Sequence, residues 1–195
     1  MPRAGFLWRH VIINTKCTWL HGSPKGFRSR NPEIRSSGDY KNPPPKGEYE
    51  KLYKYFKKVA GPEVHIPMEC LATMGQAMLQ YLREQGYPVL AIAVNKVHGH
   101  LVTELPKDRP IVKRIIGHVK RKSSRAVKRE LPGEVWSAGG EYKIVRTREH
   151  LFRAFEYVLY KQGAEAWTWS FKDRSDAGKV GRKRRRGAAL RSAPP

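Results

Sequence analysis

The chain has 195 residues, a mass of 22.4 kDa and 39% hydrophobic residues, which is enough for one full hydrophobic core and not comfortably for two. Lys and Arg number 39 against 17 Asp and Glu, giving a formal charge of +22 that is typical of polyanion-binding proteins and uncommon among enzymes for neutral ligands. We therefore expect one domain with appendages that binds nucleic acid.

The sequence offers no signal for a membrane or for an oxidising compartment. No stretch approaches the roughly 20 apolar residues of a membrane span, and the first residues lack the apolar run of a secretory signal. We expect the cytoplasm, or the nucleoid if the protein is bacterial. Cys17 and Cys70 share no CxxC or Cys/His spacing, which predicts ordinary thiols rather than a disulfide or a zinc site.

The N-terminal part of the chain predicts a strand followed by a long surface loop. Residues 9–19 are rich in β-branched and aromatic side chains, as strands are. Residues 21–47 are rich in Gly, Ser, Pro and Asn, which excludes a helix or a central strand. Arg28 and Arg30 lie in this loop among other cations and aromatic residues, a combination that suits phosphates and unstacked bases; plain disorder is the alternative.

The rest of the chain predicts helices and strands in mixed order. Helices are expected at 48–59, 68–85, from Pro110 to about Leu131, and from about Arg148 to Gln162, where Gly163 ends the last one. An edge strand is expected at 63–67, a β-hairpin at 89–94 and 97–105, a strand or irregular segment at 134–147, and an aromatic strap at 166–171.

These elements predict an α+β fold in which helices pack against an antiparallel sheet. We place one domain at 1–172. Residues 173–195 are rich in Arg, Lys, Gly and Ser and show no apolar periodicity, which predicts a disordered basic C-terminal tail that adds nonspecific affinity.

His98-Gly99-His100 is the strongest local signal for chemistry. Side chains alternate along a strand, so both imidazoles project from the same face and can share one divalent cation. The alternative is a pair of solvated histidines, because the HxH pattern often occurs by chance. The flanking apolar side chains should point the other way, into the core: Val97, Leu101 and Leu105.

The last predicted helix carries tyrosines outside its apolar stripe. At about 100° per residue, Tyr157 lies roughly 160° from the centre of that stripe. A phenol there can act as a nucleophile if a cation stabilises its phenolate. Tyr160 also lies off the stripe, so periodicity does not choose between the two, and an exposed tyrosine with no chemical role is the alternative. The stripe consists of Leu151, Phe152, Phe155, Val158 and Leu159.

The third predicted helix is strongly basic outside its apolar face. That face consists of Val112, Ile115, Ile116, Val119, Ala126 and Val127. We interpret the basic positions as a surface that follows a nucleic-acid backbone, with a solvated cationic face as the alternative. The candidate phosphate ligands are Lys113, Arg114, Lys120, Arg121, Lys122, Arg125, Lys128 and Arg129.

Four segments in this order carry a family resemblance: HVIINTK, AVNKVHGHLVTELP, VKRIIGHVKRKSSRAVKREL and FEYVLYKQGAEAWTWSF. Together, over about Gly5 to Phe171, the chain resembles the single-tyrosine HUH transposases of the insertion-sequence 200-like superfamily, which includes the REP-associated tyrosine transposases. The resemblance implies a ferredoxin-like or RRM-like sandwich, with His98 and His100 as ligands of Mg²⁺ or Mn²⁺. Tyr157 would then be the nucleophile.

The resemblance also implies the reaction and the partners. The tyrosine would attack single-stranded DNA, leaving a 5′-phosphotyrosine and a free 3′-OH, as a step of DNA transposition. Members of the family act on single strands next to hairpins and are often dimers, so single-stranded hairpin DNA and a second copy of the chain are the implied partners. The resemblance implies no small-molecule cofactor and no membrane.

Two positions depart from the family pattern. Gly99 stands where a bulky hydrophobic residue is usual, and Lys161 stands about one turn beyond Tyr157, where a polar third metal ligand is usual. Gln162 has suitable chemistry, but on a regular helix it falls roughly 140° from Tyr157, so it can serve only if the helix ends loosely at Gly163. Two other hypotheses therefore stay open: an inactive or domesticated relative that binds DNA or RNA hairpins without cutting them, and an RNA-binding sandwich of ribosomal type.

Overall fold

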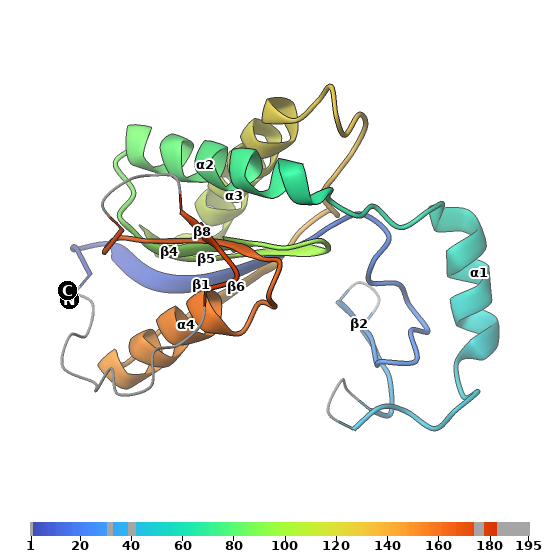
Figure 1. Ribbon diagram of the computed structural model, residues 1–195. Coiled ribbons are helices and arrows are strands. Elements are labelled where there is room, and N and C mark those ends of the chain that lie inside the picture. Colours follow the sequence, from blue (N-terminus) through green and yellow to red (C-terminus); the bar gives the residue numbers. More distant parts are fainter. Residues whose placement is uncertain (1, 31–32, 39–41, 174–177, 183–195) are drawn as a thin grey trace. The chain divides into compact units, whose positions relative to one another are not determined.

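The computed structural model describes residues 2–30, 33–38, 42–173 and 178–182 (Figure 1). They belong to two compact units. The sheet unit comprises Met1–Asn14 and His65–Pro195, and the inserted unit comprises Thr15–Val64. No helix in these described ranges combines the length and the apolar content that crossing a membrane requires.

The sheet unit is built on a six-stranded antiparallel sheet in the order β6-β1-β5-β4-β7-β8. β1 and β5 are its longest pair, running from Phe6 opposite Pro106 to Asn14 opposite His98. The expected α+β class with an antiparallel sheet is therefore confirmed. The strands are β1 (Phe6–Asn14), β4 (Val89–Val94), β5 (His98–Pro106), β6 (Glu141–Ile144), β7 (Trp167–Ser170) and β8 (Lys179–Val180).

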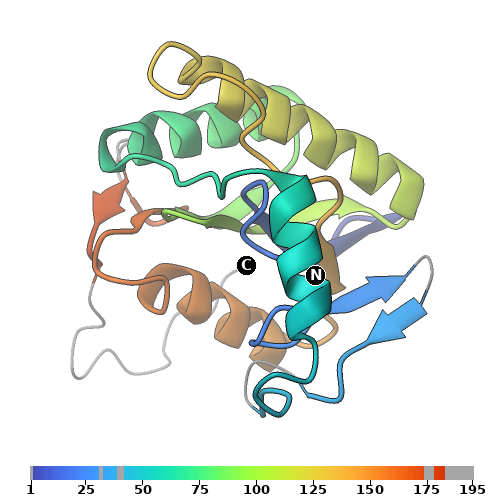
Figure 2. The same cartoon turned by 90° about the vertical axis from the view of Figure 1, so that its right-hand side faces the viewer.

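Helices cover both faces of this sheet. α2 (Met68–Glu84) and α3 (Arg109–Ala126) pack against each other on one face, and α4 (Arg148–Tyr160) lies on the other (Figures 1 and 2). Strand alternation divides β5 between the two faces. Val102 packs into the cluster around α4 with Phe155 and Val158, and His98 and His100, an even number of residues away, face the same side.

The core on the other face shows why α2 packs so closely. Its stripe of Leu71, Met74, Met78 and Leu82 is buried, as periodicity predicts. Gly75 lies directly against the ring of Trp167, since a Cβ at that position would collide with the ring carbons. Burying side chains of this size stabilises the fold by about 1.5–3 kcal/mol each. The segment expected as an aromatic strap is thus an inner strand, β7, with all four residues buried.

Several boundaries differ from the sequence-based expectation. β1 ends at Asn14 rather than Trp19, because the chain turns near Cys17, whose φ is +65°. Residues 63–67 form no strand. α3 ends at Ala126, so Lys128 and Arg129 lie in the following turn. Ala126, which was expected on the apolar face of this helix, is exposed. Ser123 is buried on that face instead.

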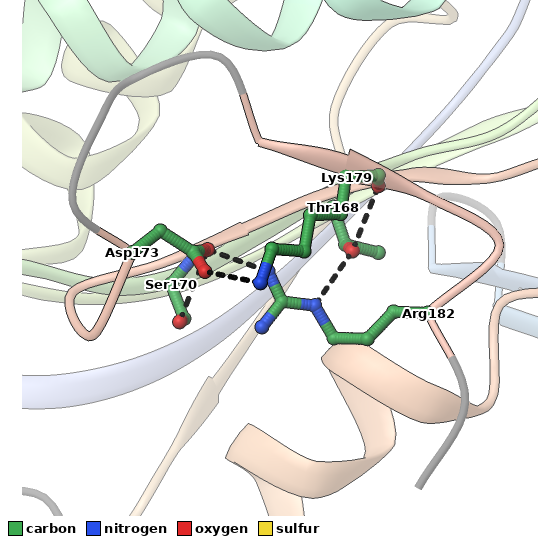
Figure 3. A network of polar contacts seen from close by, with 5 residues as sticks. All are labelled: Thr168, Ser170, Asp173, Lys179 and Arg182. Atoms are coloured by element: carbon green, nitrogen blue, oxygen red, sulfur yellow. Dashed lines mark hydrogen bonds and ion pairs between the residues drawn. The ribbon is translucent and has the colours of Figure 1, made fainter.

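The fold continues beyond the expected boundary at residue 172. Lys179 and Val180 form β8 against β7. The Arg182 guanidinium pairs with the Asp173 carboxylate at 2.5 Å and donates from Nε to Thr168 Oγ1 at 3.2 Å (Figure 3). The expectation of disorder from 173 onward is therefore wrong for residues 178–182. The rest of the expected tail, 174–177 and 183–195, lies outside the described residues.

The inserted unit contains a two-stranded sheet and one helix. β2 (Arg28–Arg30) pairs with β3 (Glu33–Arg35), and α1 (Glu50–Ala60) follows. The segment expected as an irregular loop thus contains a short hairpin, whereas the expected helix at 48–59 is confirmed as α1. The side chains of Arg28 and Arg30 lie outside the described part of the structure.

Candidate active site

The two histidines singled out by their spacing lie side by side on the α4 face of β5. The ring centroids of His98 and His100 are 4.7 Å apart, with the ring planes at 86°. His100 is only 3% exposed, and His98 is partly buried. β1 supports this end of β5, with Ile12 opposite His100 and Asn14 opposite His98. Both rings are therefore fixed by the longest strand pair of the sheet.

Gly99 has a packing reason to lie between them. A Cβ at this position would lie 3.2 Å from Ile13 Cγ1 and 3.5 Å from the ring of Trp136. Trp136 comes from the connection between α3 and β6, and its Nε1 donates to Ser123 Oγ at 3.0 Å. Trp136 thus fills space on the core face of β5 that a bulky residue at 99 would need.

A third histidine, His10 on β1, completes the cluster. Its Nε2 lies 3.0 Å from Nδ1 of His100, so one ring nitrogen donates to the other. His10 is 8% exposed. Spacing did not reveal this residue, because its partner is 90 positions away in the sequence. The only available signal was a polar side chain inside the apolar run of the first strand.

The electrostatics of the cluster favour uncharged imidazoles. Burial, followed by the neighbouring His98, His10 and Lys143, lowers the pKa of His100 to about 2. Burial also lowers the pKa of His10 to about 4, with Lys143 as the next cause. Burial lowers the pKa of His98, and the hydrogen bond that its Nε2 donates to Gln162 Oε1 opposes this shift. At neutral pH the rings are therefore uncharged, and a ring whose lone pair is not used in the His10–His100 hydrogen bond can offer it to a cation.

Gln162 reaches this cluster because α4 ends early. The helix stops at Tyr160, and Lys161 is its C-cap. The next residue leaves the helical path: Gln162 Nε2 donates to the carbonyl oxygen of Tyr157 at 2.9 Å, and its Oε1 lies 3.2 Å from His98 Nε2. Gln162 is buried and Lys161 is exposed. The condition under which Gln162 could meet the histidines is therefore fulfilled.

Asn95 organises the turn that presents His98. Its side-chain Oδ1 accepts from the backbone N–H groups of Val97 and His98, at 3.0 and 2.9 Å. Its Nδ2 lies 2.8 Å from His98 Nε2 and 3.3 Å from the Gln162 carbonyl oxygen. The sequence indicated Asn95 only as a turn residue, since Asn is common in turns. Here it also links the β4–β5 turn to the end of α4.

Tyr157 and Tyr160 occupy different surroundings. Tyr157 is 45% exposed, and its ring centroid lies 5.5 Å from His100 and 5.8 Å from His10. Tyr160 is partly buried and packs against the apolar cluster beneath α4. Tyr157 therefore combines access to solvent with proximity to the histidines. It also borders a surface pocket lined by Arg153, Glu156, Tyr157, Tyr160 and Lys161.

The basic positions of α3 lie away from the histidines, because α3 covers the opposite face of the sheet. Lys120 does not belong to the exposed surface that the sequence suggested. Its Nζ donates to the carbonyl oxygens of Ser137 and Gly139, and burial lowers its pKa to about 8. Lys120 thus fixes the α3–β6 connection. The other seven candidates are exposed: Lys113, Arg114, Arg121, Lys122, Arg125, Lys128 and Arg129.

Metal-binding chemistry at the cluster would come from two imidazoles and one amide oxygen. Within the described ranges, no group of three or more His, Cys, Asp and Glu side chains is arranged to hold a metal ion. His98, His100 and Gln162 form a mixed set of neutral nitrogen and oxygen donors. Imidazole suits transition metals, whereas amide oxygen suits Mg²⁺ and Mn²⁺, so this set fits Mn²⁺ better than Mg²⁺.

Comparisons of the chain with protein-family models, with curated proteins and with solved structures found no match.

Proposed function

We propose that this chain is a metal-dependent single-stranded DNA nickase and strand transferase of the single-tyrosine HUH type, acting in DNA transposition. One observation carries the proposal: Tyr157 lies beside His100, His98 lies against His100, and Gln162 contacts His98, although these residues come from separate segments of the chain. A half-exposed phenol next to neutral imidazoles is unusual for a purely structural cluster, because perturbed groups gather at functional sites.

The fold supports the same proposal. The strand order β6-β1-β5-β4, with α2 and α3 together on one face, agrees with a ferredoxin-like or RRM-like sandwich. In such a sandwich β1 and β5 are the two central strands. His10, His98 and His100 are carried by these two strands, which pair along nine residue positions.

The chemical step transfers a phosphoryl group to Tyr157. Its phenolic oxygen bonds to phosphorus while the bond from phosphorus to the 3′ oxygen breaks. The phenol gives up its proton, and the departing oxygen gains one to become a 3′-OH, so one phosphodiester is exchanged for another. The 5′-phosphotyrosine keeps the bond energy for rejoining. Arg153 and Lys161 line the pocket beside Tyr157 and supply positive charge for a phosphate.

His98, His100 and Gln162 would hold a divalent cation, which when bound polarises the phosphate. His10 acts as a positioning residue: with His100 Nδ1–H donating to His10 Nε2, the His100 ring is fixed and its Nε2 keeps the lone pair for a ligand. Asn95 and Gln162 both contact His98 at its Nε2 atom, and Asn95 also fixes the turn that presents this ring.

Covalent trapping tests the proposal. The full chain is incubated with end-labelled single-stranded hairpin DNA from the flanks of its gene, with Mn²⁺ or with EDTA, and separated by denaturing electrophoresis. We expect a slow covalent band that requires Mn²⁺, disappears in Tyr157→Phe and persists in Tyr160→Phe. Normal cleavage by Tyr157→Phe would refute the assignment of the nucleophile. Tight binding without any adduct, with Mn²⁺ or with EDTA, would instead support the binding-only hypothesis.

A further inference from the structure

The helix α1 uses only one side to hold the inserted unit together. Its half-buried side chains include Phe56, whose ring centroid lies 4.8 Å from that of His21. Cys17 Sγ donates to the carbonyl oxygen of Ala60 at 2.9 Å. A Cβ on Gly22 would collide with the backbone of Tyr53, so the preceding segment lies directly against the helix. The inner side of α1 is therefore already occupied.

The outer side of α1 is a continuous basic face. The helix contains four lysines and one acidic residue, Glu50, so its side chains sum to +3. Glu50 pairs with Lys54 at 2.7 Å. Lys51, Lys54 and Lys58 follow the i, i+3, i+7 spacing that lines up on one side, and all three are exposed. They span about 10 Å along the axis, at 1.5 Å per residue.

An aromatic ring borders this row of cations. Tyr55 is 62% exposed, and its ring packs edge-on against Phe56 with centroids 5.4 Å apart. Phe56 thus supports the ring from the inner side and leaves the phenol accessible. An accessible ring beside a row of lysines is the combination with which proteins bind single strands, since cations meet phosphates and rings stack on bases.

We propose that the outer face of α1 binds single-stranded nucleic acid, with Lys51, Lys54 and Lys58 on phosphates and Tyr55 stacked on a base. A single strand suits this face better than a duplex, whose paired bases would not reach Tyr55. An anionic membrane suits it less, because interfacial helices bury a broad apolar face. The apolar side of α1 faces inward, and Val59 is the only exposed aliphatic residue of the helix.

This surface goes beyond the proposed strand cleavage, because it needs neither Tyr157 nor a metal. The test therefore uses the full chain carrying Tyr157→Phe, in EDTA, with a labelled dT30 oligonucleotide and fluorescence anisotropy at 50–400 mM salt. Adding Lys51→Ala and Lys58→Ala should lower the salt slope by about 1.4, at 0.7 per phosphate on single strands. From 1 M to 0.1 M salt, a slope that is smaller by about 1.4 log units changes the binding constant by about 10 to the power 1.4. At 0.1 M salt the affinity for dT30 should therefore fall about 25-fold.

The matched control removes the same charge elsewhere. Lys107→Ala with Lys172→Ala changes two exposed lysines of the sheet unit and should leave the slope unchanged. Tyr55→Ala should weaken dT30 binding about tenfold, the range of one lost base stack, whereas Tyr55→Phe should retain it. Circular dichroism verifies that each variant is folded.

Two results would overturn the inference. One is the absence of the expected effect on dT30 binding. This would be an unchanged salt slope and affinity in the Lys51→Ala and Lys58→Ala variant, or equal affinities of Tyr55→Ala and Tyr55→Phe. The other is a loss of binding to phosphatidylserine vesicles in that variant while dT30 binding stays intact, which would make the face a membrane contact. Since Tyr157→Phe is present throughout, neither result bears on strand cleavage.

Discussion

His10 offers the sharpest test of the proposed metal site, because it contacts a proposed ligand without being one. In His10→Leu, the Nδ1 atom of His100 loses its partner at 3.0 Å inside a site where His100 is 3% exposed. An unsatisfied buried polar group costs about 1–3 kcal/mol. The His100 ring can also turn once this contact is gone. Losing a hydrogen bond that orients a metal ligand typically weakens metal binding by about 10–100-fold. We expect a loss of Mn²⁺ affinity within that range.

The assay is calorimetric titration of Mn²⁺ into the full chain, which requires no DNA and no turnover. His10→Gln restores a side-chain oxygen and nitrogen near Nδ1 and should recover part of the affinity, whereas His10→Leu should not. His118→Ala is the matched control, because this α3 histidine stacks on Tyr81 of α2 on the opposite face of the sheet, and its loss should leave Mn²⁺ binding unchanged. The reasoning fails if His10→Leu binds Mn²⁺ as the wild type does, or if Gln and Leu behave alike.

Three further expectations follow from other contacts. Gln162→Ala should weaken Mn²⁺ binding by at least about tenfold, the smallest loss typical even of residues that only hydrogen-bond to a ligand, while Lys161→Ala leaves it unchanged, as read by the same titration. The opposite ranking would assign the third ligand position to residue 161. Gly99→Val should cost about 1–3 kcal/mol of unfolding free energy in urea, because the added methyl groups crowd Ile13 and Trp136; an unchanged midpoint would show that this region adapts freely. Burial raises the pKa of Asp173, but the hydrogen bonds from Arg182 and Ser170 outweigh burial and bring this pKa below its ordinary 3.8. The stability that the ionised carboxylate contributes is therefore present above pH 3.8 and is lost as the pH falls through the lowered pKa. Hydrogen exchange at β8 should accelerate over that acidic range in the wild type, and Asp173→Asn should exchange fast already at pH 6; equal protection in both at pH 6 would contradict this role.

Local periodicity predicted the parts of the site that lie within one element. A two-residue repeat put His98 and His100 on one face, and a 3.6-residue repeat put Tyr157 outside the core of α4. The choice between Tyr157 and Tyr160 needed the third dimension, because only the structure shows Tyr160 packed against the apolar cluster and Tyr157 beside the histidines. Periodicity describes a helix surface but not what lies next to it.

The remaining site residues depend on distances that spacing cannot give. His10 meets His100 only through the register of β1 on β5, which brings together positions 90 apart. Gln162 meets His98 only because α4 ends two residues before it, and helix ends are the least predictable part of a helix. Lys120 looked like its basic neighbours, yet its amine folds back onto two carbonyl oxygens. Each of these three contacts depends on a local irregularity or on a long-range strand pairing, neither of which residue spacing can predict.

The sheet lies between the basic surface of α3 and the candidate active site, two features that the sequence analysis had assigned to one DNA-binding function. The cations of α3 lie on one face, and Tyr157 with the histidines lies on the other. In the proposed reaction, a phosphate held by α3 would therefore not be the one that Tyr157 attacks, and the positive charge at that bond would come from Arg153, Lys161 and the proposed cation. The neutrality of the buried imidazoles fits this division, because protonated rings would compete with that cation for the same space. Under the proposed function, affinity for DNA and competence for cleavage would then depend on different residues, so a relative could lose the second and keep the first.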